Sequence, residues 1–412
     1  MLYGLIGEKL SHSFSKEIHG RLADYDYTLT EIEPQKLETF FTERDFCGLN
    51  VTVPYKTEVI KFLDEIDTAA AQIGAVNTVI NRGGKLYGYN TDAEGLTALI
   101  KKNGIEISGK KVLILGSGGT SRTALYVANS MGAKSVIQVS RAEKEGFITY
   151  GEALSSQNDA DVIINTTPCG MFPSSGDTPI DLTFFSRLNA VVDVIYNPLK
   201  TRLVIGAQMR GIKAVGGLYM LVAQAAAASK LFTGENADRD STERVYNEIL
   251  SEKRNIVLIG MPTCGKTTVG KILSKQLGMD FYDTDELITV KTGHTPAEII
   301  KEQGEKRFRE TESEVIARLS NKNHCVIATG GGAVTVKENI LSLKANGKLF
   351  FLDRPVSLLE SAPDRPLSSN RETLEKLYES RIAIYKSAAD KVVKNDADIH
   401  SAVDIIREDL MP

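Results

Sequence analysis

Two glycine-rich segments, each placed between an apolar strand and a helix, constrain the fold of this 412-residue chain most. The first covers residues 116–121 and follows the apolar stretch 111–115, and the second covers 260–267 and follows 255–259. Turns without bulky side chains let backbone N–H groups and a helix N-terminus approach anionic oxygens. The order strand, glycine-rich turn, helix therefore predicts α/β architecture with two phosphate-binding loops.

The two loops predict different chemistry. The first lacks a lysine and is typical of a dinucleotide-binding turn, with a plain tight turn as the alternative. The second carries Lys266 and Thr267, the pair that reaches the β- and γ-phosphates and Mg²⁺ in a P-loop. We expect cofactor contacts in the first loop at Gly116, Ser117, Gly118, Gly119 and Thr120. We expect nucleotide contacts in the second at Gly260, Cys264, Gly265, Lys266, Thr267 and Thr268.

Length and composition limit the number of domains and the kinds of partner that this protein is expected to have. A chain of 412 residues exceeds what one hydrophobic core usually supports, so two or three domains are expected. Lys and Arg number 49 against 53 Asp and Glu, and this net charge of −4 gives no electrostatic reason to expect nucleic acid or a membrane as partner. The four cysteines lack metal-ligand spacing, and no signal segment or membrane-spanning apolar run is visible. We therefore expect a cytoplasmic protein.

Apolar stretches and helical patterns alternate along the whole chain. Strands are expected at 2–6, 27–30, 49–53, 111–115, 135–139, 161–165, 190–194, 255–259, 326–328 and 348–352, and helices at 34–43, 92–102 and 218–232. Residues 234–254 turn polar and charged, which indicates a domain boundary formed by a short helix rather than a flexible tether. The remaining residues, 255–412, have the length of a compact P-loop domain.

Arg141 bears on the choice of dinucleotide. It follows the strand 135–139, at the place where an NAD-binding fold carries an acidic residue for the ribose 2′-hydroxyl. A guanidinium suits a 2′-phosphate instead, so NADP is favoured over NAD. A solvated surface arginine is the alternative.

Polar side chains in the first half gather at the ends of predicted elements, where α/β folds bind ligands. The segments are Ser11–Ser15, Asn50–Lys56, Gly74–Thr78 and Gly88–Asp92, followed later by 165–171, 193–198 and 219–225. Singly, these residues also fit helix caps, turn formers and solvated charges. In this order they resemble the shikimate dehydrogenase family across about residues 1–248.

That resemblance implies specific roles. Lys56 and Asp92 would be the catalytic pair, with the lysine supplying a proton to the ketone oxygen of 3-dehydroshikimate. The substrate ligands would be Ser13, Ser15, Thr52, Asn77, Tyr196 and Gln224. The NADP(H) contacts would add Arg141, Thr167 and Gly217 to the first loop. The segment 140–142 reads Ser-Arg-Ala where the family usually has Asn-Arg-Thr, and residues 141–161 leave room for only a short strand and little helix, so the adenosine side is expected to be trimmed.

The second half contains further segments downstream of its loop. They are Phe281–Asp285, Gly304–Glu312, Thr329–Ala333, Asp364–Leu367 and Arg381–Tyr385. Alone, Arg309 and Glu312 are most simply a helix-surface ion pair. As a set, these segments resemble the shikimate kinase family across about residues 254–412.

This second resemblance implies a shikimate site beside ATP. Catalytic roles fall on Asp285, Lys266 and Arg365, Mg²⁺ on Thr267 and Asp283, and the substrate on Arg309, Gly331, Gly332 and Arg381. Guanidinium forks match a carboxylate geometrically, which favours arginine at 309 and 381. Thr263 stands where related kinases often have glycine, and the lid stretch 355–364 is shorter than usual.

Together the resemblances imply a bifunctional α/β enzyme of aromatic amino-acid biosynthesis that makes shikimate and then phosphorylates it. Its domains would be an α/β substrate domain at 1–103, completed by 218–248, a Rossmann-like NADP domain at 104–217, a linker at 234–254, and a P-loop kinase with a central parallel sheet at 255–412. A quinate- or NAD-using first half and a non-catalytic shikimate sensor are the alternatives. Oligomeric state, domain orientation and channelling of shikimate stay open.

Overall fold

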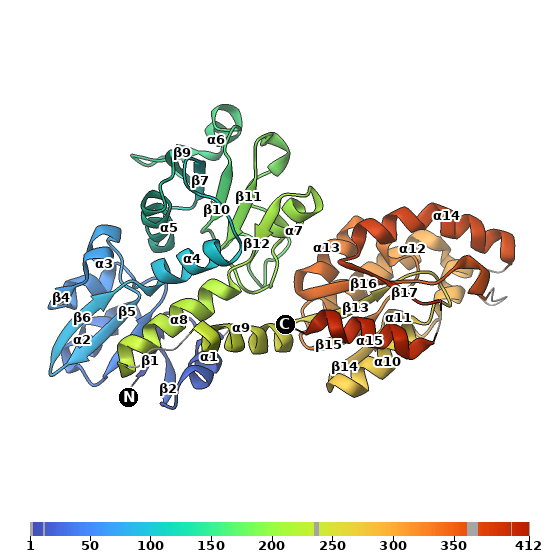
Figure 1. Ribbon diagram of the computed structural model, residues 1–412, viewed down its shortest axis with the longest axis horizontal. Helices are drawn as coiled ribbons and strands as arrows, with labels where there is room; N and C mark the ends of the chain where they lie inside the picture. The colour runs from blue at the N-terminus through green and yellow to red at the C-terminus, as the bar shows by residue number, and fades with distance from the viewer. Residues whose placement is uncertain (1–2, 11–12, 235–238, 361–369, 397, 412) are drawn as a thin grey trace. The chain divides into compact units, whose positions relative to one another are not determined.

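The computed structural model describes residues 3–10, 13–234, 239–360, 370–396 and 398–411. The chain divides into two compact units, Met1–Ile249 and Leu250–Pro412, whose elements are labelled in Figure 1. Within the described ranges, no helix is both long and apolar enough to cross a membrane.

The first sheet of unit 1 is mixed, with strand order β2-β1-β3-β5-β6-β4. Its strands are β1 (Tyr3–Gly7), β2 (Tyr27–Glu31), β3 (Gly48–Val51), β4 (Glu65–Ile66), β5 (Thr78–Arg82) and β6 (Lys85–Tyr89). Helices α1 (Ser15–Leu22), α2 (Leu37–Glu43) and α3 (Thr68–Ile73) connect them, with 3₁₀ turns η1 (Pro34–Lys36) and η2 (Glu58–Phe62), and α4 (Thr91–Lys102) leads from β6 to the second sheet. β2, β1 and β3 run parallel, whereas β5 pairs antiparallel with β3 and β6. The strand predicted at 49–53 ends at Val51, so Thr52 and Lys56 lie in the turn that follows it.

The second sheet of unit 1 is entirely parallel, with order β12-β11-β10-β7-β8-β9. Its strands are β7 (Lys111–Leu115), β8 (Ser135–Ser140), β9 (Ile148–Thr149), β10 (Val162–Asn165), β11 (Ala190–Asp193) and β12 (Lys213–Val215). The helices are α5 (Gly119–Ser130), α6 (Tyr150–Ser156), α7 (Arg202–Met209) and α8 (Leu218–Thr233), with the 3₁₀ turn η3 (Leu182–Phe184). The short strand and little helix expected between 141 and 161 are confirmed, because β9 has two residues and α6 seven.

Alternate residues of β7 face opposite layers of this second sheet, as the period of a strand requires. Val112 and Ile114 belong to a buried cluster with residues of α4, α5 and α8. Leu113 and Leu115 belong to another cluster, with residues of α6 and α7. A strand covered on both faces is apolar throughout, which is why the stretch 111–115 could be recognised in the sequence.

The polar segment after α8 is largely helical. Helix α9 (Arg239–Lys253) packs on unit 1 through the rings of Tyr219 and Tyr246, 5.1 Å apart, and through an ion pair between Lys102 and Glu243 at 2.5 Å. Val245 and Ile249 are fully buried. The division between the units falls inside this helix, between Ile249 and Leu250.

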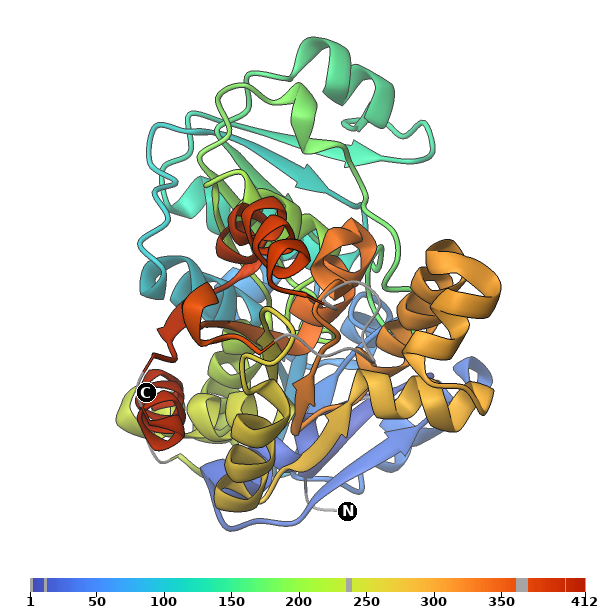
Figure 2. The same cartoon turned by 90° about the vertical axis from the view of Figure 1, so that its right-hand side faces the viewer.

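Unit 2 has one parallel sheet with order β14-β15-β13-β16-β17, and Figure 2 gives a second view of the helices that flank it. The strands are β13 (Asn255–Ile259), β14 (Asp280–Asp283), β15 (Cys325–Ala328), β16 (Gly347–Asp353) and β17 (Lys391–Lys394). The helices are α10 (Lys266–Leu277), α11 (Thr284–Thr292), α12 (Pro296–Leu319), α13 (Lys337–Asn346), α14 (Arg371–Ala388) and α15 (Ile399–Leu410), with 3₁₀ turns η4 (Ala333–Thr335) and η5 (Val356–Leu358). α12 bends at Gly304, where φ is 88°.

Both glycine loops lie at carboxyl ends of parallel strands. Residue 116 follows β7, and residue 260 follows β13. The carboxyl ends of parallel strands form the edge at which open α/β sheets bind ligands. Each unit therefore has its phosphate loop at the edge where a site is expected.

Two candidate active sites

Lys56 and Asp92 form the centre of the first site. Nζ of Lys56 donates to Oδ2 of Asp92 at 2.5 Å, and the two side chains are only 14% and 8% exposed. Asp92 lies in the first turn of α4, whose N-terminus favours a negative charge. The pair therefore presents a positioned ammonium, the group that can protonate a developing alkoxide.

The amide of Asn77 is oriented by its neighbours. Its Oδ1 accepts the backbone N–H of Thr91 at 2.7 Å and the hydroxyl of Thr78 at 3.1 Å, so its Nδ2 faces Asp92 and donates to Oδ1 at 2.9 Å. The hydroxyl of Thr91 also donates to Oε1 of Gln224 on α8, at 3.5 Å. The predicted ligands Asn77 and Gln224 thus meet the catalytic pair through one hydrogen-bonded cluster.

Ser13, Ser15 and Tyr196 form a second group of predicted substrate ligands. The hydroxyl of Ser13 donates to that of Ser15 at 3.0 Å, and the ring of Phe14 between them lies 5.2 Å from the ring of Tyr196. Thr52 follows β3, which pairs with β1, and its N–H donates to Ile6 at 2.9 Å. Hydroxyls that are held near one another in this way suit a polyhydroxylated ligand.

The first glycine loop approaches the catalytic lysine. A Cβ added at Gly119, the first residue of α5, would lie 3.5 Å from Cβ of Lys56. At Gly116, where φ is 118°, a Cβ would come within 2.6 Å of the Thr166 hydroxyl, so the loop requires glycine there. Gly116, Gly118 and Gly119 therefore leave backbone open at the N-terminus of α5 for an anionic cofactor group, and Ser117 and Thr120 lie in the same turn.

The other predicted cofactor residues surround this loop. Arg141 is exposed just after β8, and its charge acts on Tyr150 and on Cys169 in the segment after β10. Thr167 in that segment donates its hydroxyl to Oδ1 of Asn165 at 2.7 Å. Gly217 directly precedes α8, its N–H donates to the carbonyl oxygen of Ile195 at 2.8 Å, and a Cβ there would lie 2.1 Å from the carbonyl oxygen of Val194. Gly217 is thus required by a close backbone approach, and its N–H already has a partner.

Lys266 is folded back into the second glycine loop. Its Nζ donates to the carbonyl oxygens of Gly260 at 3.0 Å and Met261 at 2.7 Å, and the residue is 8% exposed. Gly265 precedes α10 with φ of 96°, and Cys264 in the loop is buried. Thr268 lies exposed in the first turn of α10. The loop has the arrangement of a P-loop.

Thr267 and Asp283 meet at the predicted metal site. The hydroxyl of Thr267 donates to Oδ2 of Asp283 at 2.7 Å, and Oδ1 of Asp283 accepts the N–H of Asp285 at 3.0 Å. The described residues hold no cluster of three or more His, Cys, Asp or Glu arranged for a metal. A hydroxyl and one carboxylate fit Mg²⁺, which takes most of its remaining ligands from water and phosphate.

Arg309 and Glu312 lie in the interior of unit 2. The guanidinium donates to Oε2 of Glu312 at 2.7 Å, and the Glu312 side chain is fully buried. The interpretation of these two residues as a surface ion pair is therefore wrong. Burial raises the pKa of Glu312, although the Arg309 charge lowers it, and the charges of Asp285 and Arg381 also act on Glu312. Glu312 is a site residue to which the sequence analysis assigned no role.

The triple-glycine segment packs against these charged groups. A Cβ at Gly332 would lie 2.1 Å from Nη2 of Arg309, and one at Gly330 would lie 2.9 Å from Oδ1 of Asp285. The hydroxyl of Tyr385, one turn after the buried Arg381 on α14, donates to the carbonyl oxygen of Gly331. These contacts bring Asp285, Arg309, Gly331, Gly332 and Arg381 together. Arg365 lies outside the described residues.

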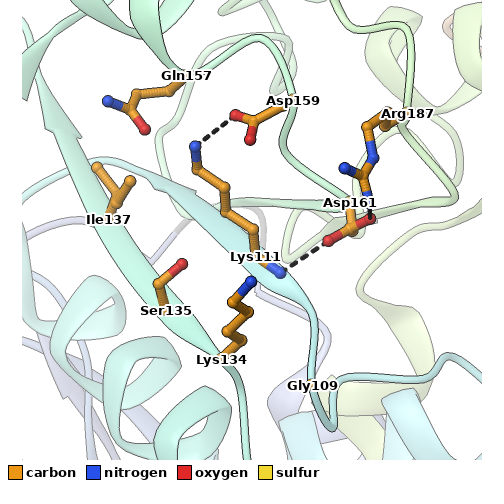
Figure 3. Close-up of a pocket in the computed structure, with 9 residues that line it drawn as sticks. All are labelled: Gly109, Lys111, Lys134, Ser135, Ile137, Gln157, Asp159, Asp161 and Arg187. Atoms are coloured by element: carbon orange, nitrogen blue, oxygen red, sulfur yellow. Dashed lines mark hydrogen bonds and ion pairs between the residues drawn. The ribbon is translucent and has the colours of Figure 1, made fainter.

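A separate cavity of about 400 Å³ lies at the amino edge of the second sheet of unit 1 (Figure 3). Lys111, Asp159, Asp161 and Arg187 line it, and their charges are paired with one another. It contains none of the predicted site residues, and it lies at the opposite strand ends from the loop at 116–121. We assign no ligand to it.

These arrangements define an α/β enzyme that combines a dinucleotide-type oxidoreductase site with a P-loop kinase site. Family models match the shikimate dehydrogenase substrate-binding domain at residues 5–79, the shikimate 5′-dehydrogenase C-terminal domain at 217–245, and shikimate kinase at 262–410. The chain belongs to the shikimate dehydrogenase family over its first part and carries a shikimate kinase domain after it. The expected fusion of an oxidoreductase with a kinase of the shikimate pathway is confirmed.

Individual relatives agree with this assignment. The NADP(+) shikimate dehydrogenase of Clostridium perfringens strain 13 is 37% identical over 267 residues, which span 60% of this chain and 98% of that protein. The enzyme of Halothermothrix orenii is 39% identical over 56% of this chain and 90% of its own. Solved structures include shikimate dehydrogenase 1 of Peptoclostridium difficile, at 35% identity and a TM-score of 0.57 over 60% of this chain and 97% of that one. The Thermus thermophilus enzyme in complex with NADP(H) and shikimate matches at 29% identity and a TM-score of 0.55, over 60% and 99%.

Proposed function

We propose that the first unit reduces 3-dehydroshikimate to shikimate with NADPH. When bound, NADPH supplies the hydride. Lys56 donates the proton that the ketone oxygen takes up, and Asp92 holds the ammonium in place. The observation that carries this proposal is the Lys56–Asp92 pair at 2.5 Å, with the glycine loop against the same lysine. Ser13, Ser15, Thr52, Asn77, Tyr196 and Gln224 bind the carboxylate and hydroxyls of the substrate.

The second unit, in this proposal, transfers a phosphoryl group from Mg·ATP to O3 of shikimate. Asp285 orients and deprotonates the hydroxyl, and Arg309 and Arg381 bind the carboxylate. Lys266 would bind the β- and γ-phosphates, and Thr267 and Asp283 would hold Mg²⁺. The Thr267–Asp283 contact at 2.7 Å beside the folded-back lysine supports this assignment. Arg365 would stabilise the transferring group.

For these functions we propose the domains predicted from the sequence, with the linker at 234–254. Residues 1–103 and the helical region 218–248 form the substrate-binding part, 104–217 form the NADP-binding part, and 255–412 form the kinase. The close packing of α4 against α8 supports placing α8 in the substrate-binding part. A Cβ added at Gly95 of α4 would lie only 2.6 Å from the carbonyl oxygen of Met220 of α8. Helices that approach so closely pack as one body.

NADPH and shikimate are preferred over NADH and quinate in this proposal. Arg141 stands after β8, where it can bind a 2′-phosphate, and relatives are named as NADP(+) enzymes. A quinate dehydrogenase of Corynebacterium glutamicum in complex with NAD is also similar, at 27% identity and a TM-score of 0.54, so substrate and cofactor are tested together. Steady-state rates with the four combinations of shikimate or quinate and NADP⁺ or NAD⁺ should give the highest kcat/KM for shikimate with NADP⁺.

A coupled assay tests the whole proposal. Purified chain supplied with 3-dehydroshikimate, NADPH and Mg·ATP should oxidise NADPH and form ADP in equal amounts. Binding of shikimate without either reaction would indicate a sensor instead. Free shikimate added to the same assay should compete fully with shikimate made in place, unless the intermediate is channelled.

We further propose a cytoplasmic location, because the thiols of Cys47, Cys169, Cys264 and Cys325 are all free.

A further inference from the structure

Asp193 ends strand β11, which lies between β12 and β10, with a fully buried carboxylate. Three groups donate hydrogen bonds to it. Oδ1 accepts Nδ2 of Asn165 at 3.0 Å and the N–H of Ile195 at 3.1 Å, and Oδ2 accepts the hydroxyl of Thr201 at 2.6 Å. All three partners donate to the ionised carboxylate, whereas the proton of a neutral acid at Oδ2 finds an acceptor only if the Thr201 hydroxyl gives up its donation and accepts instead.

One side of this network reaches the cofactor loop. Oδ1 of Asn165 accepts the N–H of Thr167 at 3.1 Å and its hydroxyl at 2.7 Å. The Thr167 hydroxyl in turn accepts the N–H of Cys169 at 3.3 Å. The preceding residue of this loop, Thr166, lies against Gly116 of the phosphate loop. Asn165 therefore connects Asp193 to the predicted cofactor residue Thr167 through hydrogen bonds to both.

The other side reaches the predicted substrate residue Tyr196. Asp193 fixes the N–H of Ile195, whose carbonyl oxygen accepts the N–H of Gly217 at 2.8 Å. Tyr196 follows directly and contacts Phe14 between the two predicted substrate serines. The hydroxyl of Thr201 also caps α7 by accepting the N–H of Val204 at 3.3 Å. One carboxylate thus anchors segments from both halves of the site.

The charge of this carboxylate changes near neutral pH. Burial raises the pKa of Asp193 to about 6, although the hydrogen bonds from Thr201, Ile195 and Asn165 lower it. Its three donors are uncharged. Among the described residues, the titratable group that faces it is the thiol of Cys169, whose own pKa is raised by burial and by the charges of Asp177 and Asp193, and lowered by Arg141.

We propose that ionised Asp193 is a positioning residue of the dehydrogenase, which holds the cofactor loop and the Tyr196 segment in their binding conformation and holds them less firmly when it is protonated. This inference rests on the proposed dehydrogenase function. It adds a buried group that touches neither substrate nor cofactor and that makes dinucleotide binding depend on pH. The effect follows because protonation turns charge-assisted hydrogen bonds into weaker neutral ones.

Asp193→Asn tests the inference, since the amide keeps the shape of the carboxylate and removes its charge. We expect the Kd for NADP⁺, measured by calorimetric titration of the full chain, to rise about tenfold at pH 8, as for one charge-assisted hydrogen-bond network weakened by about 1.4 kcal/mol. At pH 5.5, where about three quarters of Asp193 is protonated, the difference between the two Kd values should shrink to about threefold. The 2′-phosphate itself titrates near pH 6, so the difference between the two proteins, not either profile alone, is the measured quantity.

Asp181→Asn is the matched control. Asp181 accepts the N–H and hydroxyl of Thr183 at the exposed start of η3, so the same change is made away from both loops. This variant should follow the wild type at both pH values. Equal Kd values for Asp193→Asn and wild type at pH 8, or a tenfold difference that persists at pH 5.5, would overturn the inference.

Stability provides a readout that separates positioning from folding. A raised folded-state pKa means that Asp193 stabilises the fold below about pH 4 and that this contribution is lost as the pH rises through about 6. Asp193→Asn should therefore unfold at pH 8 no more easily than the wild type, while binding NADP⁺ more weakly. A variant that loses binding only because it unfolds contradicts the inference. Failure of the wild type to reduce 3-dehydroshikimate while it still binds NADP⁺ would refute the proposed function separately, because the Kd comparison needs no turnover.

Discussion

Nζ of Lys56 donates to Oδ2 of Asp92 at 2.5 Å, and both residues belong to unit 1. Lys56→Ala should lower the kcat of NADPH oxidation by about 10²–10⁴-fold, because the positioned proton donor is lost. ADP formation from added shikimate should not change. Lys61→Ala, an exposed lysine over the Phe62 ring, is the control and should keep both rates. Loss of both activities in Lys56→Ala would contradict independent sites.

The reciprocal change is Lys266→Ala. Removing the ammonium that binds the β- and γ-phosphates should lower kinase kcat at least about 10²-fold, in line with loss of one electrostatic donor to the transition state. NADPH oxidation in the same chain should be unaffected, which reports that unit 1 is intact. Lys271→Ala, on the exposed side of α10, should retain kinase activity measured as ADP release.

Thr263 gives a prediction about backbone strain. Its φ of 61° is one that residues other than glycine seldom adopt, and its hydroxyl accepts the N–H of Glu360 at 3.1 Å. Thr263→Gly removes about 1 kcal/mol of strain and about the same amount of hydrogen bonding, so the melting temperature of unit 2 should hardly move. The phosphate loop loses a fixed contact, and kinase kcat/KM for ATP should fall about fivefold.

Thr263→Ser is the conservative companion, because serine keeps the hydroxyl. It should restore most of the kcat/KM for ATP that the glycine variant loses. If the glycine variant binds and turns over ATP as well as the wild type, the hydroxyl contact with Glu360 has no part in shaping the loop.

His19 predicts how the stability of unit 1 depends on pH. It is fully buried, its ring stacks on Tyr27 at 4.0 Å, and burial lowers its pKa to about 3. The unfolded chain binds a proton below pH 6.5 that the folded chain does not, so stability is lost as the pH falls from 6.5 to about 3, by up to about 1.4 kcal/mol per pH unit.

Urea unfolding of unit 1 at several pH values measures this effect. His19→Phe keeps a stacked ring and removes the titration, so its free energy of unfolding should fall less steeply below pH 6.5. His294→Phe, at an exposed position in unit 2, should leave the profile of unit 1 unchanged. Parallel profiles for the wild type and His19→Phe would refute the assignment.

Local patterns predicted the phosphate loops and the strands that precede them, because a strand buried on both faces and a glycine turn leave direct marks in the sequence. The burial of Glu312 was not predictable in this way. The spacing of Arg309 and Glu312 shows that they share a helix face, but not whether that face meets solvent or the interior. The network around Asp193 joins residues from 165 to 201, and only the parallel pairing of β10 with β11 brings them together.

The carbonyl oxygens of Gly260 and Met261 already surround the ammonium of Lys266. Most of the water around this charge has therefore been removed during folding rather than when nucleotide arrives. When ATP binds, the Lys266 ammonium exchanges these two carbonyl oxygens for phosphate oxygens. The cation is already largely dehydrated, so only its hydrogen-bond partners change. The contribution of the lysine to ATP affinity is therefore the difference in interaction free energy between phosphate oxygens and peptide oxygens. The free-energy cost of dehydrating the ammonium lowers the stability of the domain instead of the affinity for ATP.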